Sequence, residues 1–249
     1  MKILLSAAAL CGMMTSANAQ AFEFKSATFT LSYEQFSYPD GRDEASKSFS
    51  STLDVGFGGQ FGLGAALNTH DLSNYPEETY YSLTLRPYYT VSTELDVGLI
   101  LEKNFSEYSG GAGHGILYGF DVAYYAPNGF AATGYVATGQ DFRDIDADFA
   151  GLTVGYGFAN GFDFGAYAKT TRYDGGVDVT RTGLTAGYLF ASDSLPVPVY
   201  LSGYIGTQEY TGSHDTMGLS LTIPVGTARL GKGQRPSANN HDTLYEYYN

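Results

Sequence analysis

The sequence is poor in three things: cysteine, positive charge and long apolar runs. Its one cysteine, Cys11, lies in an N-terminal stretch that we expect to be removed, so the mature chain has no thiol or disulfide chemistry. Only 13 residues are basic against 26 acidic ones. Because phosphate binding needs clustered Lys and Arg, this balance argues against a nucleic acid partner. The apolar run at the N-terminus is too short for a helical membrane span, which needs roughly 20 residues.

The N-terminus has the pattern of a secretory signal peptide. Lys2 gives the positive charge, 3–14 is largely apolar, and Ala17-Asn18-Ala19 is a small-x-small cleavage site, so we expect 1–19 to be removed. A lipoprotein signal would need a small residue before Cys11, where the chain has Leu10. Removing Lys2 leaves 12 basic residues against 26 acidic ones, a net charge of −14 on 230 residues.

Apolar and small or polar residues alternate through most of the remaining chain. In 49–57, for example, Phe49, Leu53 and Val55 alternate with serine, threonine, aspartate and glycine. A period of two indicates strands with one apolar face. The predicted strands, most of them long enough for a tilted membrane strand of roughly 9–11 residues, are 22–36, 47–57, 60–70, 79–91, 94–105, 116–126, 129–140, 148–158, 161–173, 177–190, 198–210 and 216–225.

The predicted connections alternate between two kinds. Tight turns are expected at 58–59, 92–93, 127–128, 160 and 191–197, and longer acidic loops at 37–46, 71–78, 106–115, 141–147, 174–176 and 211–215. Short turns on one side and longer loops on the other are typical of outer-membrane barrels.

Aromatic residues flank the predicted strand ends on both sides. Those beside the tight turns are Phe57, Phe61, Tyr124, Phe130, Phe158, Phe162 and Phe190. Those at the opposite ends are Tyr33, Phe36, Tyr81, Phe105, Phe142, Phe149, Tyr173 and Tyr210. Two belts of aromatic residues, one on each side of an apolar band, form the interfacial girdles of a membrane barrel. The sequence therefore predicts an all-β fold: a transmembrane antiparallel up-and-down β-barrel of twelve strands, over 20–225.

On these features the chain resembles the porin-like outer-membrane β-barrel proteins of Gram-negative bacteria. The resemblance covers roughly 22–225 and implies an outer-membrane location, with membrane lipid, lipopolysaccharide and the barrel-assembly machinery as partners. Members usually end on an aromatic residue that closes the last strand, whereas here a polar tail, 226–249, follows it. The tail is expected to be disordered and periplasmic. Its last residues include Tyr245, Tyr247 and Tyr248, so it either carries a displaced assembly signal or has no such role.

Charged residues on the inward face are the candidate functional site. The same alternation assigns to that face the pore-lining candidates Glu34, Asp54, Arg86, Glu94, Asp96, Glu102, Asp121, Asp163, Lys169 and Arg181, together with ten glycines from Gly62 to Gly218. Twelve strands make a barrel wider than the eight-stranded kind that side chains fill. One hypothesis is a water-filled, cation-preferring pore, because the acids outnumber the bases. The alternative is a plugged barrel in which Arg86, Lys169 and Arg181 neutralise three of the acids.

The sequence shows no catalytic, metal or cofactor site. His70 precedes Ser73 with a spacing of three, which in a strand points the two side chains in opposite directions, unlike the His-x-Ser of lipid-hydrolysing barrels. His114 and His214 are expected in loops and His241 in the tail, and no nucleophile–base set forms.

A run of aspartates at 144, 146 and 148 resembles the start of an EF-hand. It lacks the glycine and the glutamate that such a loop requires, so at most a weak divalent-ion site is expected. The sequence thus predicts a porin-type channel for passive diffusion of small polar or cationic solutes. The alternative is a non-conducting surface or structural barrel.

Overall fold

The computed structural model describes residues 23–38, 41, 43–57, 59–72, 79–108, 111–141, 145–191, 197–209 and 212–226. The predicted signal peptide, 1–19, lies outside these residues, as does the tail beyond Gly226. Among the described residues, no helix has the length and apolar character needed to span a bilayer.

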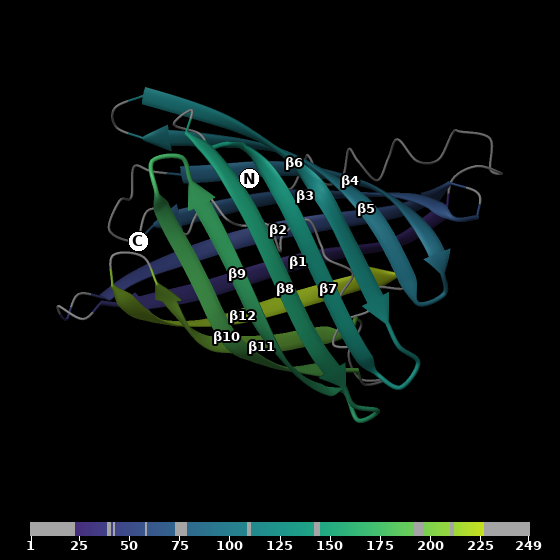
Figure 1. The fold of residues 1–249 in the computed structure, drawn as a ribbon. Helices are drawn as coiled ribbons and strands as arrows, with labels where there is room; N and C mark the ends of the chain where they lie inside the picture. Colours follow the sequence, from purple (N-terminus) through teal and green to yellow (C-terminus); the bar gives the residue numbers. More distant parts are fainter. Residues whose placement is uncertain are drawn as a thin grey trace.

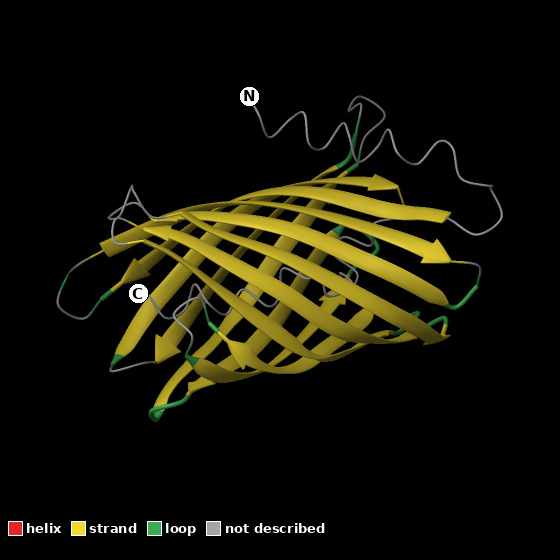
Figure 2. Ribbon diagram, turned by 90° about the horizontal axis from the view of Figure 1, so that it is seen from above, coloured by secondary structure: helices red, strands yellow, loops and turns green. Residues whose placement is uncertain are grey.

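Twelve antiparallel strands form a closed barrel, as the alternation predicts (Figures 1 and 2). Each strand pairs with its neighbours in sequence, and β1 closes the ring against β12. The strands are β1 (Glu23–Ser37), β2 (Asp43–Phe57), β3 (Phe61–Leu72), β4 (Thr79–Ser92), β5 (Leu95–Tyr108), β6 (Gly111–Tyr125), β7 (Phe130–Gln140), β8 (Asp146–Gly157), β9 (Phe162–Tyr173), β10 (Val177–Phe190), β11 (Val199–Glu209) and β12 (Ser213–Gly226).

We call the strand ends joined by the tight turns the inner ends of the barrel and the opposite ends the outer ends. Two of the tight turns at the inner ends share the sequence Asn-Gly-Phe and the same geometry. In each, the asparagine side chain accepts a hydrogen bond from the backbone N–H two residues on: Asn128 from Phe130 at 3.1 Å and Asn160 from Phe162 at 3.2 Å. Gly129 and Gly161 have φ values of 98° and 92°, which a side chain would disfavour. The tight turns predicted at these two places are confirmed.

Most of the outer connections are shorter than predicted, because the strands continue into them; the connection at 174–176 has the predicted length. β2 begins at Asp43, four residues before its predicted start, and β12 begins at Ser213. The largest change is between β5 and β6, where pairing continues to Tyr108 and Gly111. Here the sequence no longer alternates in hydropathy, yet the backbone ladder persists, so the expected loop at 106–115 is wrong.

The outer face carries the apolar side chains of the alternating pattern. Leu31, Leu83, Phe120, Leu184 and Leu219 are each between 46 and 65% exposed, although they lie in the middle of strands. A soluble protein rarely exposes such a continuous apolar surface, whereas a membrane barrel presents it to lipid.

An aromatic girdle at the inner end of the strands is confirmed by packed rings. Phe61 lies 5.0 Å from Tyr89, and Phe162 lies 4.4 Å from Tyr188, between ring centroids. All four residues belong to the outward-facing set.

The outer girdle contains fewer residues than predicted. Tyr33, Tyr81 and Phe105 face outward and are 37–45% exposed. Phe36, Phe149 and Tyr173 instead point into the barrel and are at most 3% exposed, because the parity of their strands places them there. Phe142 and Tyr210 lie outside the described residues.

Candidate functional site

Nine of the ten charged residues assigned to the interior lie on the inward face of their strands. Residues paired across neighbouring strands point to the same face, so the strand register fixes which residues face inward all around the closed barrel. They are Glu34, Asp54, Arg86, Asp96, Glu102, Asp121, Asp163, Lys169 and Arg181. Glu94 lies instead in the turn between β4 and β5, at the inner rim, where its carboxylate accepts a 3.5 Å hydrogen bond from the Tyr124 hydroxyl.

Arg86 and Asp121 form a buried, bidentate ion pair. The guanidinium Nε and Nη2 each donate to one carboxylate oxygen at 2.5 Å, and the two side chains are 3% and 0% exposed. The pair joins β4 to β6 across β5, where the residue beneath it is Gly98. A Cβ on Gly98 would lie 2.7 Å from Asp121 and 3.0 Å from Arg86, so glycine is what allows the bridge.

Tyr88 connects this pair to the first strands. Its hydroxyl donates to Asp54 at 2.6 Å and accepts from the Lys25 ammonium at 3.0 Å. Arg86 lies over its ring, 5.0 Å from the centroid. Lys25 is an inward base that sequence parity misses, because a β-bulge between Phe24 and Ser26 puts it out of step.

A second ion pair joins β10 to β1. Arg181 donates through Nη2 to Glu34, and through the same nitrogen to the Tyr204 hydroxyl at 3.0 Å. Its guanidinium also lies over the rings of Phe36 and Tyr204, each 5.6 Å from the centroid. Arg181 is therefore held against the wall of the barrel by one charge and two aromatic faces.

Three more inward acids accept hydrogen bonds from hydroxyl groups. Thr84 donates to Glu102 and Thr90 to Asp96, both at 2.7 Å. On the other side of the barrel, Tyr200 reaches from β11 across β10 to both oxygens of Asp163, at 2.9 Å.

Two of the ion pairs that the plugged-barrel hypothesis expects are present. Arg86 and Arg181 each pair with one acid, as that hypothesis expects. Lys169 is half-buried, and its ammonium lies 6.0 Å from the centre of the Tyr167 ring.

Several inward glycines make room for aromatic side chains. A Cβ at Gly62 would lie 2.2 Å from Tyr88, one at Gly151 2.2 Å from Tyr135, and one at Gly218 2.3 Å from Tyr204. The rings therefore lie flat along the wall, over the neighbouring strand. The space that small residues were expected to leave for water is, at these positions, filled by the rings.

The outer end of the interior is closely packed. Phe149 and Tyr173 form an apolar cluster with Leu117, Ala147 and Val179, and each of the five is at most 4% exposed. Around the rest of this end, Phe36, Ser46, Ser106, Gln208 and Thr216 are each at most 2% exposed.

Two histidines lie in this outer part of the interior. His70 on β3 is 9% exposed, and His214 on β12 is 8% exposed. The His214 ring contacts that of Tyr38 at 4.7 Å, and the Tyr38 hydroxyl donates to Glu44 at 3.0 Å. His214 was expected in a loop, and that expectation is wrong because β12 begins at Ser213.

His114 was also expected in a loop but belongs to β6, where it is exposed and pairs with Phe105. Asp146 and Asp148 lie on the exposed face of β8 rather than in a loop, and 142–144 lies outside the described residues. The described residues contain no group of three or more His, Cys, Asp or Glu side chains placed to hold a metal.

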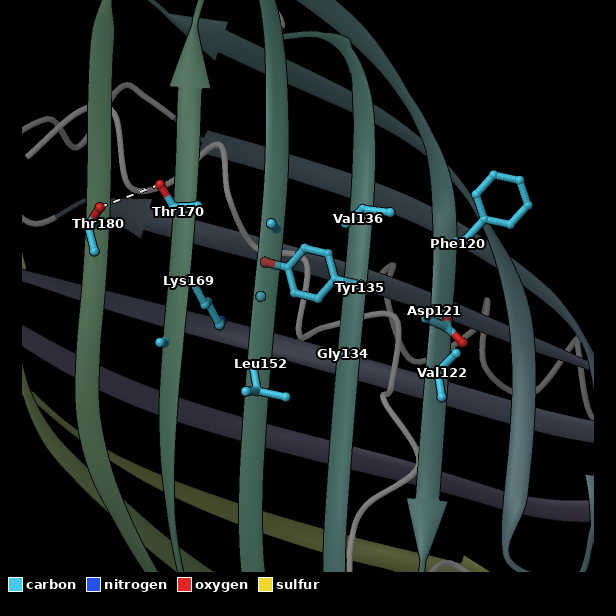
Figure 3. Close-up of a pocket in the computed structure, with 13 residues that line it drawn as sticks. Phe120, Asp121, Val122, Gly134, Tyr135, Val136, Leu152, Lys169, Thr170 and Thr180 are labelled. Carbon is cyan, nitrogen blue, oxygen red and sulfur yellow. Dashed lines mark hydrogen bonds between the residues drawn. The ribbon is translucent and has the colours of Figure 1, made fainter.

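A shallow groove of about 600 Å³ lies across the wall formed by β6–β10 (Figure 3). Small outward residues, Gly134, Ala150 and Ala168, form its floor, and larger ones such as Phe120 and Leu152 form its sides. It opens on the lipid-facing side of the wall, away from the charged interior.

The comparisons with known proteins agree on the architecture. No family model and no curated protein matches the chain. An outer-membrane channel from Pseudomonas putida F1 is similar, with a TM-score of 0.57, 11% identity, and coverage of 85% of this chain and 100% of that one. The NanC porin has a TM-score of 0.54, 10% identity, and coverage of 78% and 98%.

A third similar structure is the KdgM porin solved in complex with disordered oligogalacturonate. Its TM-score is 0.51 at 8% identity, and the match covers 79% of this chain and 98% of that one. At such low identities the likeness concerns the fold: this chain has the fold of the porin-like outer-membrane β-barrels. Together with the exposed apolar outer face, that fold indicates an outer-membrane location.

Proposed function

We propose that this protein is a porin-type channel, exported by cleavage after Ala19, through which small polar or cationic solutes diffuse along an acidic lumen. The observation that carries the proposal is the charge of the inward face. Its described carboxylates are Glu23, Glu34, Glu44, Asp54, Asp96, Glu102, Asp121 and Asp163, and its described bases are Lys25, Arg86, Lys169 and Arg181. The bases are half as many as the acids, so pairing neutralises at most half of the carboxylates.

The surplus negative charge supports cation preference. Fixed charges along a narrow passage attract ions of the opposite sign and repel those of the same sign. Hydrogen bonds such as Thr84 to Glu102 and Thr90 to Asp96 hold carboxylates in place without cancelling their charge.

The placement of the long side chains supports an open passage. Tyr88, Tyr135 and Tyr204 lie along the wall over glycines instead of projecting toward the barrel axis. Arg86 and Arg181 are likewise held against the wall by their acid partners.

The packed outer end favours a second candidate, a barrel that does not conduct and has a structural role. Phe36, Val179 and Gln208 are each 0% exposed, although all three face inward. A passage must go through this region, so its packing decides between the two functions.

Recording from the refolded mature chain in a planar lipid bilayer tests the proposal. A channel gives discrete current steps in KCl. A barrel that is correctly folded, as judged by its β-sheet circular dichroism and heat-modifiable gel mobility, yet never conducts would favour the structural role and overturn the channel.

A further inference from the structure

The inward face of the barrel divides into two chemically different walls. The first wall, on β12 and β1–β5, is rich in hydroxyl and amide groups: Thr216, Ser220, Thr222, Ser26, Thr28, Thr30, Ser32, Ser46, Ser48, Ser50, Thr52, Asn68, Ser82, Thr84, Thr90, Asn104 and Ser106. The second wall, on β6–β11, carries most of the inward aromatic rings: Tyr125, Tyr135, Phe149, Tyr167, Tyr173, Tyr200 and Tyr204. The two walls differ in their hydroxyl, amide and aromatic groups, and this difference does not follow from the positions of the charged residues.

One row of the first wall is continuous across six strands. Strand register places Thr222, Thr30, Ser50, Asn68, Ser82 and Asn104 side by side, and we name this row the hydroxyl track. The track begins near the inner end of β12 and finishes near the outer end of β5, so it follows the length of the lumen. Thr30 and Thr222 lie 2.9 Å apart through their hydroxyls, and Asn68 donates to Ser82 at 2.8 Å.

The outer part of this wall has hydrogen-bonding capacity that the protein does not use. The Asn68 Oδ1, Asn104 Nδ2, Ser106 Oγ and Thr216 Oγ1 atoms are buried and have no hydrogen-bond partner. Their residues are between 1 and 4% exposed and face inward. A buried polar atom without a partner is unfavourable, so these groups favour a solute that offers both donors and acceptors.

The second wall offers ring faces to the same space. Tyr135, labelled in Figure 3, extends from β7 toward the neighbouring strand. Its ring lies over Gly151 on β8, and Tyr167 and Tyr204 lie over Gly183 and Gly218. A ring that lies flat on a wall exposes its apolar face toward the lumen.

We propose that the lumen recognises a neutral saccharide, with the hydroxyl track binding the sugar hydroxyls and the tyrosine wall contacting the C–H faces of the sugar rings. A saccharide carries hydroxyls around its edge and C–H groups on its faces, so it matches both walls at once. An acidic sugar is disfavoured because the inward carboxylates outnumber the bases. This inference rests on the proposed channel function and names the class of solute for it.

Sugar-dependent interruption of the ion current tests the inference. Maltotriose, added to a bilayer containing the mature full-length protein, is expected to interrupt the KCl current in a saturable manner. Polyethylene glycol of the same hydrodynamic size is expected to lower the current without saturation. Replacing Asn68→Leu or Asn104→Leu is expected to weaken maltotriose binding about fivefold each, the effect of one lost hydrogen bond.

Thr182→Val is the matched control, since Thr182 lies on the outward face of β10, where it pairs with Thr207 and does not border the lumen. Its maltotriose affinity is expected to stay within about twofold of the wild-type value, which is the scatter of a minor interaction. Ser82→Ala removes a smaller group and serves as the track variant if the leucine variants do not fold.

The outcomes separate this inference from the channel itself. A protein that conducts but responds to maltotriose and polyethylene glycol alike overturns the saccharide site and leaves the channel. Equal loss of affinity in Thr182→Val and the track variants also overturns it. A protein that never conducts overturns both proposals.

Discussion

At the scale of the residue, glycines and tyrosines act in pairs on the inward face. Tyr88 reaches the Asp54 carboxylate only because Gly62, on the strand between them, has no side chain. The same arrangement holds for Tyr135 over Gly151. The pairs keep bulky rings along the wall and let them bridge strands that are not adjacent.

Gly62→Ala is expected to destabilise the barrel by about 1–3 kcal/mol, the usual effect of an added methyl in a packed site. The new Cβ would lie 2.2 Å from Tyr88 Cζ, so the ring must leave the wall and lose its bond to Asp54. Urea unfolding in lipid vesicles measures the change.

Gly64→Ala is the matched control on the same strand, because its Cβ would lie 3.6 Å from its nearest neighbour, in Arg86. It is expected to leave the unfolding midpoint almost unchanged. Equal effects at both glycines would contradict the pairing of Gly62 with Tyr88.

Asp121→Asn is expected to destabilise the protein by about 3–5 kcal/mol, because it leaves Arg86 buried without its countercharge. Asp178→Asn breaks the exposed pair with Arg172, whose side chains are 74 and 54% exposed, and should change stability by about 0–1 kcal/mol. The free energy of unfolding in vesicles compares the two. If Asp121→Asn were as mild as Asp178→Asn, the buried bridge would not be what holds β4 to β6.

Alternation in the sequence was sufficient to place most inward charges, since parity alone decides the face of a strand residue. It failed for Lys25, because a β-bulge there changes which face the side chain points to, and no residue in the sequence indicates the bulge. Alternation also does not show which inward side chains contact each other. The contact of Arg86 with Asp121 across Gly98 depends on strand tilt and register, which cannot be read from the hydropathy pattern.

At the scale of the element, β2, β5, β6 and β12 are longer than the alternation predicts. The β5–β6 hairpin continues through Ser106–Gly113 and Tyr108–Gly111 pairs, where neither face is consistently apolar. Outside the lipid bilayer both faces of a strand can be polar. The hydropathy pattern then no longer indicates a strand, although the backbone hydrogen bonds continue. Phe36 and Phe149 were assigned to the girdle from their position near strand ends, although their parity points inward.

Leu219→Lys is expected to destabilise the barrel by about 2–4 kcal/mol, because Leu219 is 62% exposed in the middle of β12 and faces lipid. Glu209→Lys, at the outer end of β11, introduces the same side chain near the membrane interface and should change stability by about 0–1 kcal/mol. Unfolding of both variants in vesicles gives the comparison. A Leu219→Lys barrel as stable as Glu209→Lys would mean that β12 does not face the membrane.

At the scale of the whole molecule, the closed ring of twelve strands has an apolar outer face because apolar residues alternate with small or polar ones through most of the strands. The fold class was therefore within reach of the sequence. The division of the interior into a hydroxyl-rich wall and an aromatic wall was not, because it emerges only when the register links strands far apart in the chain.

If the interior is an acidic passage for small solutes, it must favour cations. The measurement is the reversal potential of a single channel in a tenfold KCl gradient. We expect a reversal potential of the sign that shows K⁺ crossing more readily than Cl⁻. We also expect a shift toward zero when Asp54→Asn and Asp163→Asn are combined. A reversal potential of the opposite sign, or one that these substitutions leave unchanged, would contradict the acidic lumen.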